Sequence, residues 1–211
     1  METDHLIELL AQDSSTARSF RPVLITAVFY GIVIAATVFF TSIGFRPDIF
    51  EAVKSGRFLF KFGVTITLAV SAAVTALRLG RPSESLGRKG LALAVAPALM
   101  IVAALVELLI VPESRWMPRL IGHNSRFCLT LIPFLSVGPL ACLLIALRRG
   151  APSNPGLAGA VAGLAASGIA ATLYAANCTD DSPLFVITWY PIAILTVTSV
   201  GYLMGQKLLR W

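Results

Sequence analysis

Six long apolar stretches constrain this chain more than any other feature of its sequence. Each contains about 20 residues, the number that a helix needs to cross a hydrocarbon core roughly 30 Å thick. The stretches run from about Val23 to Gly44, Phe58 to Leu77, Leu91 to Val111, Phe127 to Leu147, Leu157 to Ala176 and Leu184 to Met204. We therefore expect an all-α fold, a polytopic membrane bundle of six transmembrane helices.

The composition agrees with a chain that folds in lipid. Only 13% of the 211 residues are charged, whereas a soluble domain carries about 25%, and the mean hydropathy is +0.81. The first apolar stretch lacks the short core and cleavage site of a secretory signal peptide, so we interpret it as an uncleaved span. We expect a short N-terminal segment, residues 1–22, followed by one transmembrane domain, residues 23–211.

The distribution of basic residues predicts the orientation of the bundle. The N-terminus, second loop, fourth loop and C-terminus together contain ten lysines and arginines, and the other three loops contain six. We expect a multi-pass protein of a bacterial inner membrane, with both ends in the cytoplasm and the first, third and fifth loops in the periplasm. We attribute the net charge of +6 to the basic residues that orient the protein in the membrane. The sequence therefore predicts no direct nucleic-acid partner.

Two charged residues, Lys61 and Glu107, lie well inside the apolar stretches. An unpaired charge in the membrane interior costs about 2.5–3.5 kcal/mol or more. Both residues lie near the predicted periplasmic ends of their spans, so we expect an intramembrane ion pair between them. A structural pair or snorkelling is the simpler interpretation, and a proton or ion relay is the alternative.

Glycines four residues apart predict close helix contacts within the bundle rather than dimerisation. They are Gly159 and Gly163 in the fifth stretch and Gly201 and Gly205 in the sixth. No HExxH, CxxC, P-loop or GxSxG sequence is present, so the sequence predicts neither hydrolytic nor nucleotide chemistry. We expect a protein that is not an enzyme and has no small-molecule substrate; a small transporter and a membrane thiol oxidoreductase remain the alternatives.

The segment before the first span predicts a short amphipathic helix over about Asp4 to Gln12. Its apolar stripe consists of Leu6, Ile7, Leu9 and Leu10, at helical spacing. Such a stripe could lie on the lipid interface, fold against the bundle or dock a soluble protein. Acidic residues border it, namely Glu2, Asp4, Glu8 and Asp13. This acidic border favours a basic protein partner in the cytoplasm.

Four segments together resemble the NrsF-type family of bacterial transmembrane anti-sigma factors, negative regulators of an extracytoplasmic-function sigma factor of the sigma-F type. The segments are TDHLIELLAQD from Thr3, GHNSRFCLTLIPFLSVGPL from Gly122, ALRRGAP from Ala146 and NCTDDSPLFVITWY from Asn177. The resemblance covers most of the chain and is densest from Gly122 to Trp211. It implies a regulator that holds a sigma factor at the membrane until heavy-metal or oxidative stress releases it, with the apolar stripe as sigma-factor contact.

The resemblance also implies a sensor role for Cys128 and Cys178, which match cysteine positions of the family. Many relatives carry a histidine just before the second cysteine, where this chain has Asn177. That departure weakens any role for a histidine at this position in metal binding. Cys142 matches no functional position of the family.

The spacing of the cysteines indicates which two are neighbours. Folding the fourth and fifth stretches into a hairpin about residues 148–156 brings Cys128 level with Cys178, at the periplasmic surface where thiols meet oxidants and soft metal ions. Cys142 would lie roughly 21 Å deeper. We expect no resident cofactor, but a transient soft-metal site at Cys128 and Cys178, with His123 as the third candidate ligand. Oxidation or metal capture there should loosen the grip on the sigma factor.

Overall fold

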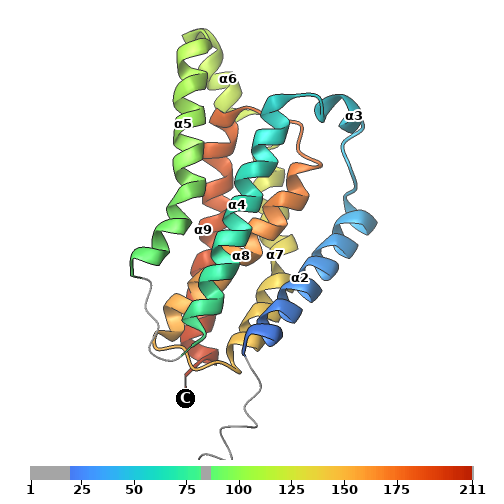
Figure 1. Cartoon of the computed structure of the whole chain (residues 1–211). Coiled ribbons are helices and arrows are strands. Elements are labelled where there is room, and N and C mark those ends of the chain that lie inside the picture. The colour runs from blue at the N-terminus through green and yellow to red at the C-terminus, as the bar shows by residue number, and fades with distance from the viewer. Residues whose placement is uncertain (1–19, 82–86, 211) are drawn as a thin grey trace, which may run out of the picture.

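A computed structural model describes residues 20–81 and 87–210 of the chain, and within them every regular element is a helix. Six helices are long and apolar enough to cross a membrane, which confirms the predicted all-α bundle (Figure 1). Four of these spans are the single helices α2 (Phe20–Ser42), α4 (Gly56–Leu79), α8 (Pro155–Ala175) and α9 (Pro183–Leu208). The other two contain α5 (Val95–Ile110), whose span begins at Gly90, and α7 (Ser125–Leu147), whose helical span begins at Glu113. The predicted N-terminal helix lies outside the described residues.

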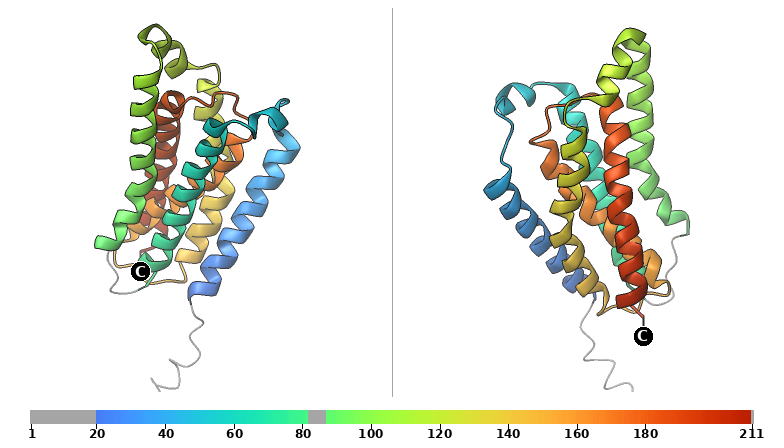
Figure 2. Two further views of the ribbon diagram at one scale, coloured as in Figure 1. Left: turned by 45° about the horizontal axis from the view of Figure 1, so that its top comes forward. Right: turned by 180° about the vertical axis from the view of Figure 1, so that it is seen from behind.

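Short helical segments occur in three of the connections. They are α3 (Ile49–Ala52) between α2 and α4, the 3-10 helix η1 (Arg88–Ala94) that leads into α5, and η2 (Glu113–Arg115) with α6 (Trp116–Ile121) between α5 and α7. Because successive long helices run in opposite directions, alternate connections gather at opposite ends of the bundle (Figures 1 and 2).

We name the two ends as Figure 1 draws them. The upper end consists of residues 43–55, 111–124 and 176–182. At the lower end α2 and α8 begin and α4, α7 and α9 end. The lower end therefore carries both chain termini of the bundle, and the upper end carries the three loops that the sequence assigns to the periplasm.

Helix α8 lies at the centre of the bundle, in contact with α9, α4 and α7. Of its most apolar 18-residue window, 72% is buried inside the protein, against 22% for the corresponding window of α2. Asn154 starts this helix, since its side chain accepts a hydrogen bond from the backbone N–H of Leu157 at 3.0 Å, and Pro155 occupies the first turn. The small side chains of α8 allow its neighbours to approach closely on several sides.

The glycines of α8 and α9 face each other. A Cβ atom on Gly159 would lie 2.2 Å from the carbonyl oxygen of Gly201, and a Cβ atom on Gly205 would lie 2.4 Å from that of Pro155. Gly163 similarly approaches the backbone of α9. The predicted contacts within the bundle are confirmed, and the lower halves of α8 and α9 pack backbone to backbone.

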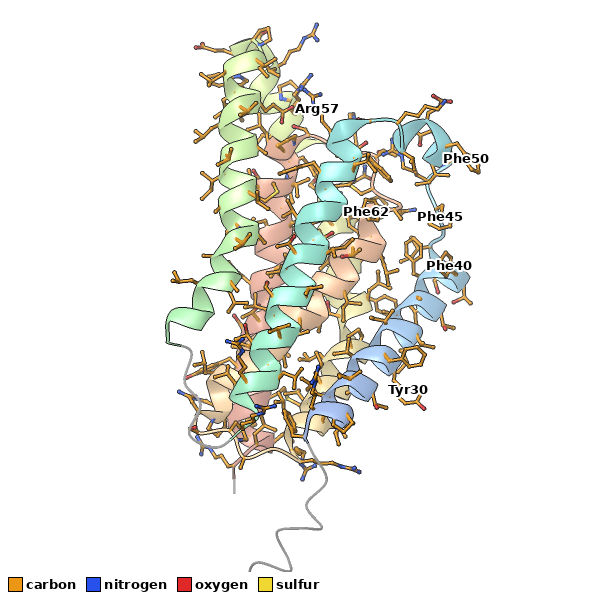
Figure 3. The ribbon with its side chains drawn as sticks, in the orientation of Figure 1. Tyr30, Phe40, Phe45, Phe50, Arg57 and Phe62 are labelled. Atoms are coloured by element: carbon orange, nitrogen blue, oxygen red, sulfur yellow. The ribbon has the colours of Figure 1, made fainter. Side chains whose placement is uncertain are left out.

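The outer helices α2 and α5 expose large apolar side chains, which suits lipid contact. Tyr30 and Phe40 project from α2 away from the bundle, and Phe45 and Phe50 follow on the same side (Figure 3); each is more than half exposed. On its inner side α2 meets α7 where Gly31 approaches Pro139. The exposed apolar surface is thus the expected outer surface of a membrane protein.

Candidate functional site

The loop between α8 and α9, residues 176–182, lies at the upper end and is held by charged and polar groups from most of the other upper-end segments. It contains two acidic residues, Asp180 and Asp181, and no basic one. Its partners come from the α2–α4 connection, α4, α5 and the α6–α7 connection. We call this loop the 176–182 loop and treat it with its partners as the candidate site.

Lys61 of α4 is held entirely by this loop. Its ammonium group donates to the Asp181 carboxylate at 2.6 Å and to the Cys178 carbonyl oxygen at 2.9 Å. Only 1% of the lysine is exposed. A buried ammonium needs such partners, because desolvation of an unpaired charge costs several kcal/mol.

Arg46, at 7% exposure, binds the same two groups from the other side. Its guanidinium donates to the Asp181 carboxylate at 2.8 Å and, more weakly, to the Cys178 carbonyl at 3.3 Å. It also forms a two-point contact with Asp48, at 2.7 Å for both bonds. The hydrogen bonds from Arg46 lower the pKa of the Asp48 carboxyl, and those with Asp48 and Asp181 raise the pKa of Arg46. Lys61 and Arg46 thus both hold the Cys178 carbonyl oxygen, and Asp181 and Asp48 balance their charge.

Glu107 of α5 caps the start of α9. One oxygen accepts from the Ser182 hydroxyl at 2.7 Å and from the backbone N–H of Leu184 at 3.1 Å, and the first turn of a helix favours a negative charge. The other oxygen pairs with Arg119 at 2.5 Å and with Arg57 at 3.5 Å. Arg57 lies at the top of α4, on the side of α5 and α6 (Figure 3).

The predicted pair between Lys61 and Glu107 is therefore wrong in its partners. Both residues are buried at the upper end, but each pairs with a residue from a loop or a short helix. The 176–182 loop folds back over the helix ends and supplies Asp181 to Lys61, while α6 supplies Arg119 to Glu107. The prediction considered only charges inside the apolar stretches, whereas these partners lie just outside them.

Asp180 caps the start of α7. Its carboxylate accepts from the backbone N–H groups of His123 and Asn124, at 2.9 and 2.8 Å, and from the Asn124 side chain at 3.0 Å. The same amide donates to the Thr179 hydroxyl at 2.8 Å. The 176–182 loop is thereby attached to the first residues of α7, one turn above Cys128.

Cys128 and Cys178 are both free and fully buried, and they belong to one hydrophobic cluster. Both lie at the upper end, Cys128 in the first turn of α7 and Cys178 within the 176–182 loop, but neither is exposed to solvent as a sensor at the periplasmic surface was expected to be. Burial raises the pKa of the Cys178 thiol despite the nearby Lys61 charge. Cys142, in the lower half of α7, is partly exposed.

Among the described residues, no group of three or more histidine, cysteine or acidic side chains is placed to hold a metal ion. The predicted set of Cys128, Cys178 and His123 is not assembled here, because the His123 side chain is 96% exposed and points toward Asp180 at 3.8 Å. The two thiols are the remaining soft ligands of that set.

Two tyrosines border the cysteine cluster. The Tyr174 hydroxyl donates to the Asn124 carbonyl at 3.3 Å, and its ring lies 6.0 Å from that of Tyr190. The Tyr190 hydroxyl is buried and has no hydrogen-bond partner among the described residues. Tyr190 also lines an apolar cavity of about 410 Å³ between α4, α5 and α9. Tyr190 thus belongs both to the hydrophobic cluster that contains the cysteines and to the lining of this cavity.

Sequence reasoning missed Arg46, Asp180 and Asp181 as the residues that organise this site. The available signal was charge balance: the fifth loop carries two acids and no base, whereas the first and third loops carry six bases. Loops that share one end of a bundle and carry opposite charges are natural partners.

Comparison with known proteins identifies relatives along the whole chain. Residues 10–211 match the model of a family described as NrsF, negative regulator of sigma F. The chain is similar to the anti-sigma-F factor NrsF of Caulobacter vibrioides, with 33% identity over 215 positions that cover both chains completely. It is likewise similar to the probable anti-sigma-F factor NrsF of Azospira oryzae, with 31% identity over 214 positions and complete coverage of both chains. No solved structure matches the chain.

Proposed function

Since this chain belongs to the NrsF family of negative regulators of sigma F, we propose that it is a membrane-bound anti-sigma factor that responds to heavy-metal or oxidative stress. It sequesters an extracytoplasmic-function sigma factor at the bacterial inner membrane and releases it when the stress reaches Cys128 and Cys178. The family match over residues 10–211 is the observation that supports the regulatory role. The position of Cys178 supports the sensing step.

In this proposal the lower end faces the cytoplasm and the upper end faces the periplasm. The excess of basic residues in the lower-end segments supports this orientation. The sigma factor then binds on the lower side, where the N-terminal segment, residues 1–22, enters the bundle. Leu6, Ile7, Leu9 and Leu10 supply the apolar contact for docking.

At rest the thiols are protected. Thiolates, not thiols, are the reactive species, and burial keeps the pKa of Cys178 raised. The cysteines therefore react only when the 176–182 loop opens, which requires separation of Asp181 from Lys61 and Arg46. A soft metal or an oxidant that captures the thiols stabilises the open form and shifts the population toward it.

Helix α4 offers a continuous path from the cysteines to the docking side. Lys61 near its upper end holds the Cys178 carbonyl. At its lower end, Gly80 packs against the ring of Phe20, the first residue of α2. The Gly80 carbonyl oxygen accepts a hydrogen bond from the backbone N–H of Ala151 at 3.1 Å. Release of Lys61 would allow α4 to move and disturb the point where the N-terminal segment joins the bundle.

Binding of the sigma factor is tested by co-purification with the detergent-solubilised full chain. The variant Leu6→Asp, Leu10→Asp removes two leucines that the proposed complex would bury, each worth about 1.5–3 kcal/mol, and should weaken a micromolar complex at least about 100-fold. Sigma-dependent transcription should become constitutive. Normal membrane insertion with full repression would place the docking surface elsewhere, and recovery of no sigma factor by the unmodified chain would contradict the proposed function.

A further inference from the structure

Three arginines meet at the lower end of the bundle, on the side opposite the candidate site. Arg21 comes from the first turn of α2, Arg78 from the last turn of α4, and Arg81 from just beyond it. Together with Val74 and Leu77 they line a pocket of about 180 Å³. Neither the ion pairs of the upper end nor the cysteine chemistry involves these residues.

The positive charge of this pocket is not compensated within the described part of the chain. No described carboxylate lies within 4.0 Å of any of the three arginines; the ion pairs of the described residues all belong to the upper end. Arg21 and Arg81 are exposed and Arg78 is partly exposed. Three guanidinium groups around one pocket indicate an anionic ligand, since they can donate several hydrogen bonds to phosphate oxygens.

The pocket also has an apolar inner part. Val74 lies seven residues before Arg81 on the same helical path, about 10 Å further along the axis, and inside the membrane-spanning α4. Val74 is 45% exposed. The lining thus changes from cationic at the helix ends to apolar within the hydrocarbon layer.

We propose that this pocket binds the phosphate headgroup of an anionic phospholipid, whose acyl chains lie along Val74 and Leu77. A phospholipid carries both required parts, an anionic head at the membrane surface and an apolar chain below it. Inorganic phosphate gains nothing from the apolar lining. An acidic protein segment would have to enter the hydrocarbon layer to reach Val74.

The bound lipid links two helices that have little direct contact. Helix α2 packs mainly on α7, and far less on α4, yet Arg21 and Arg78 both border the pocket. The lipid phosphate bridges them next to Phe20, whose ring rests on Gly80 at the end of α4. Anionic lipid thus stabilises the start of α2, and this inference holds whatever protein binds the N-terminal segment.

The test is lipid titration of the purified full chain in a neutral detergent, read by thermal unfolding and by native mass spectrometry. Dioleoyl phosphatidylglycerol should raise the unfolding temperature and remain bound, whereas dioleoyl phosphatidylcholine and inorganic phosphate should not. In the variant Arg78→Gln, Arg81→Gln the half-saturating concentration of phosphatidylglycerol should rise at least about tenfold, because two of the three guanidinium groups that donate to the phosphate are removed.

The matched control is Arg148→Gln, Arg149→Gln, which removes two exposed charges from the same end outside the pocket and should leave lipid affinity unchanged. Arg21→Gln, on the other helix, provides an independent variant should the double substitution prevent folding. Equal loss of affinity in pocket and control variants would overturn the proposal. So would an equal shift by inorganic phosphate, or an unchanged lipid affinity in the pocket variants.

Discussion

At the upper end of the bundle the buried charges of Lys61, Arg46 and Glu107 each meet a partner of opposite sign, whereas the lower-end arginines around Arg78 meet none among the described residues. The buried charges of the upper end are paired within the protein, and two thiols, those of Cys128 and Cys178, are buried there. The lower end is held by close backbone packing, and its arginines line a positively charged pocket. This difference separates a site whose charges are paired internally from an end whose positive charge stays unpaired among the described residues.

The largest effect should come from Asp181, the carboxylate that pairs with the buried ammonium of Lys61. Asp181→Asn leaves the ammonium of Lys61, 1% exposed, without its carboxylate, and an uncompensated buried charge costs about 3–5 kcal/mol. Unfolding of the purified chain in detergent measures the loss. The control Glu51→Gln breaks an exposed pair with Lys54 and should cost under about 1 kcal/mol; equal losses would show that the upper end is not closed.

The lower end should be most sensitive to the volume of its glycines. Gly159→Leu places a side chain where the Gly201 carbonyl lies, and such overpacking costs about 1–3 kcal/mol. The same unfolding measurement applies. Gly63→Ala is the matched control, because a Cβ atom there meets nothing within 4 Å and alanine favours a helix by about 0.5–1 kcal/mol. A stable Gly159→Leu protein would contradict the close packing of α8 on α9.

Thiol labelling should distinguish closed from open states of the upper end. Because burial raises the pKa of Cys178, the thiol stays protonated at pH values where a free cysteine, with a pKa near 8.5, has ionised. Labelling of Cys178 by a maleimide, in a chain with the other two cysteines replaced by serine, should be slow. Its rate should continue to increase with pH above about pH 9. Asp181→Asn should accelerate it roughly tenfold, about 1.4 kcal/mol; a rate unaffected by this change would contradict gating by the ion pairs.

The smallest effect is expected at an exposed residue of the same end. His123→Ala removes a side chain that is 96% exposed, so stability should change by less than about 0.5 kcal/mol. The response of target genes to cadmium should also persist. Loss of that response would indicate that His123 binds metal together with Cys128 and Cys178, as the sequence predicted.

Hydrophobicity and length were sufficient to predict the six helices, because each apolar stretch must be helical to satisfy its backbone in lipid. The predicted first and last residues lie within about four positions of the helices observed. The glycine spacing also predicted the α8–α9 contact, since only close backbone packing favours glycine at those positions.

The candidate site was harder to predict, because its partners come from loops whose paths no periodicity determines. Lys61 and Glu107 could be recognised as buried charges, but Asp181 and Arg119 reach them only because the 176–182 loop and α6 fold over the helix ends. Because the 176–182 loop folds back over the helix ends, Cys178 within it is buried rather than exposed. Helix counting places a residue along the bundle axis, but does not show what lies above it.

In the proposed function, stress reaches the sigma factor through Cys178, within the 176–182 loop, and Cys128, in the first turn of α7. The most direct measurement is induction of sigma-dependent transcription by cadmium, chromate or peroxide in cells that carry Cys128→Ser, Cys178→Ser, with Cys142→Ser as the matched control. The double variant should still repress transcription but no longer respond to stress, while the control should respond normally. Undiminished induction in the double variant would contradict this role of the two cysteines.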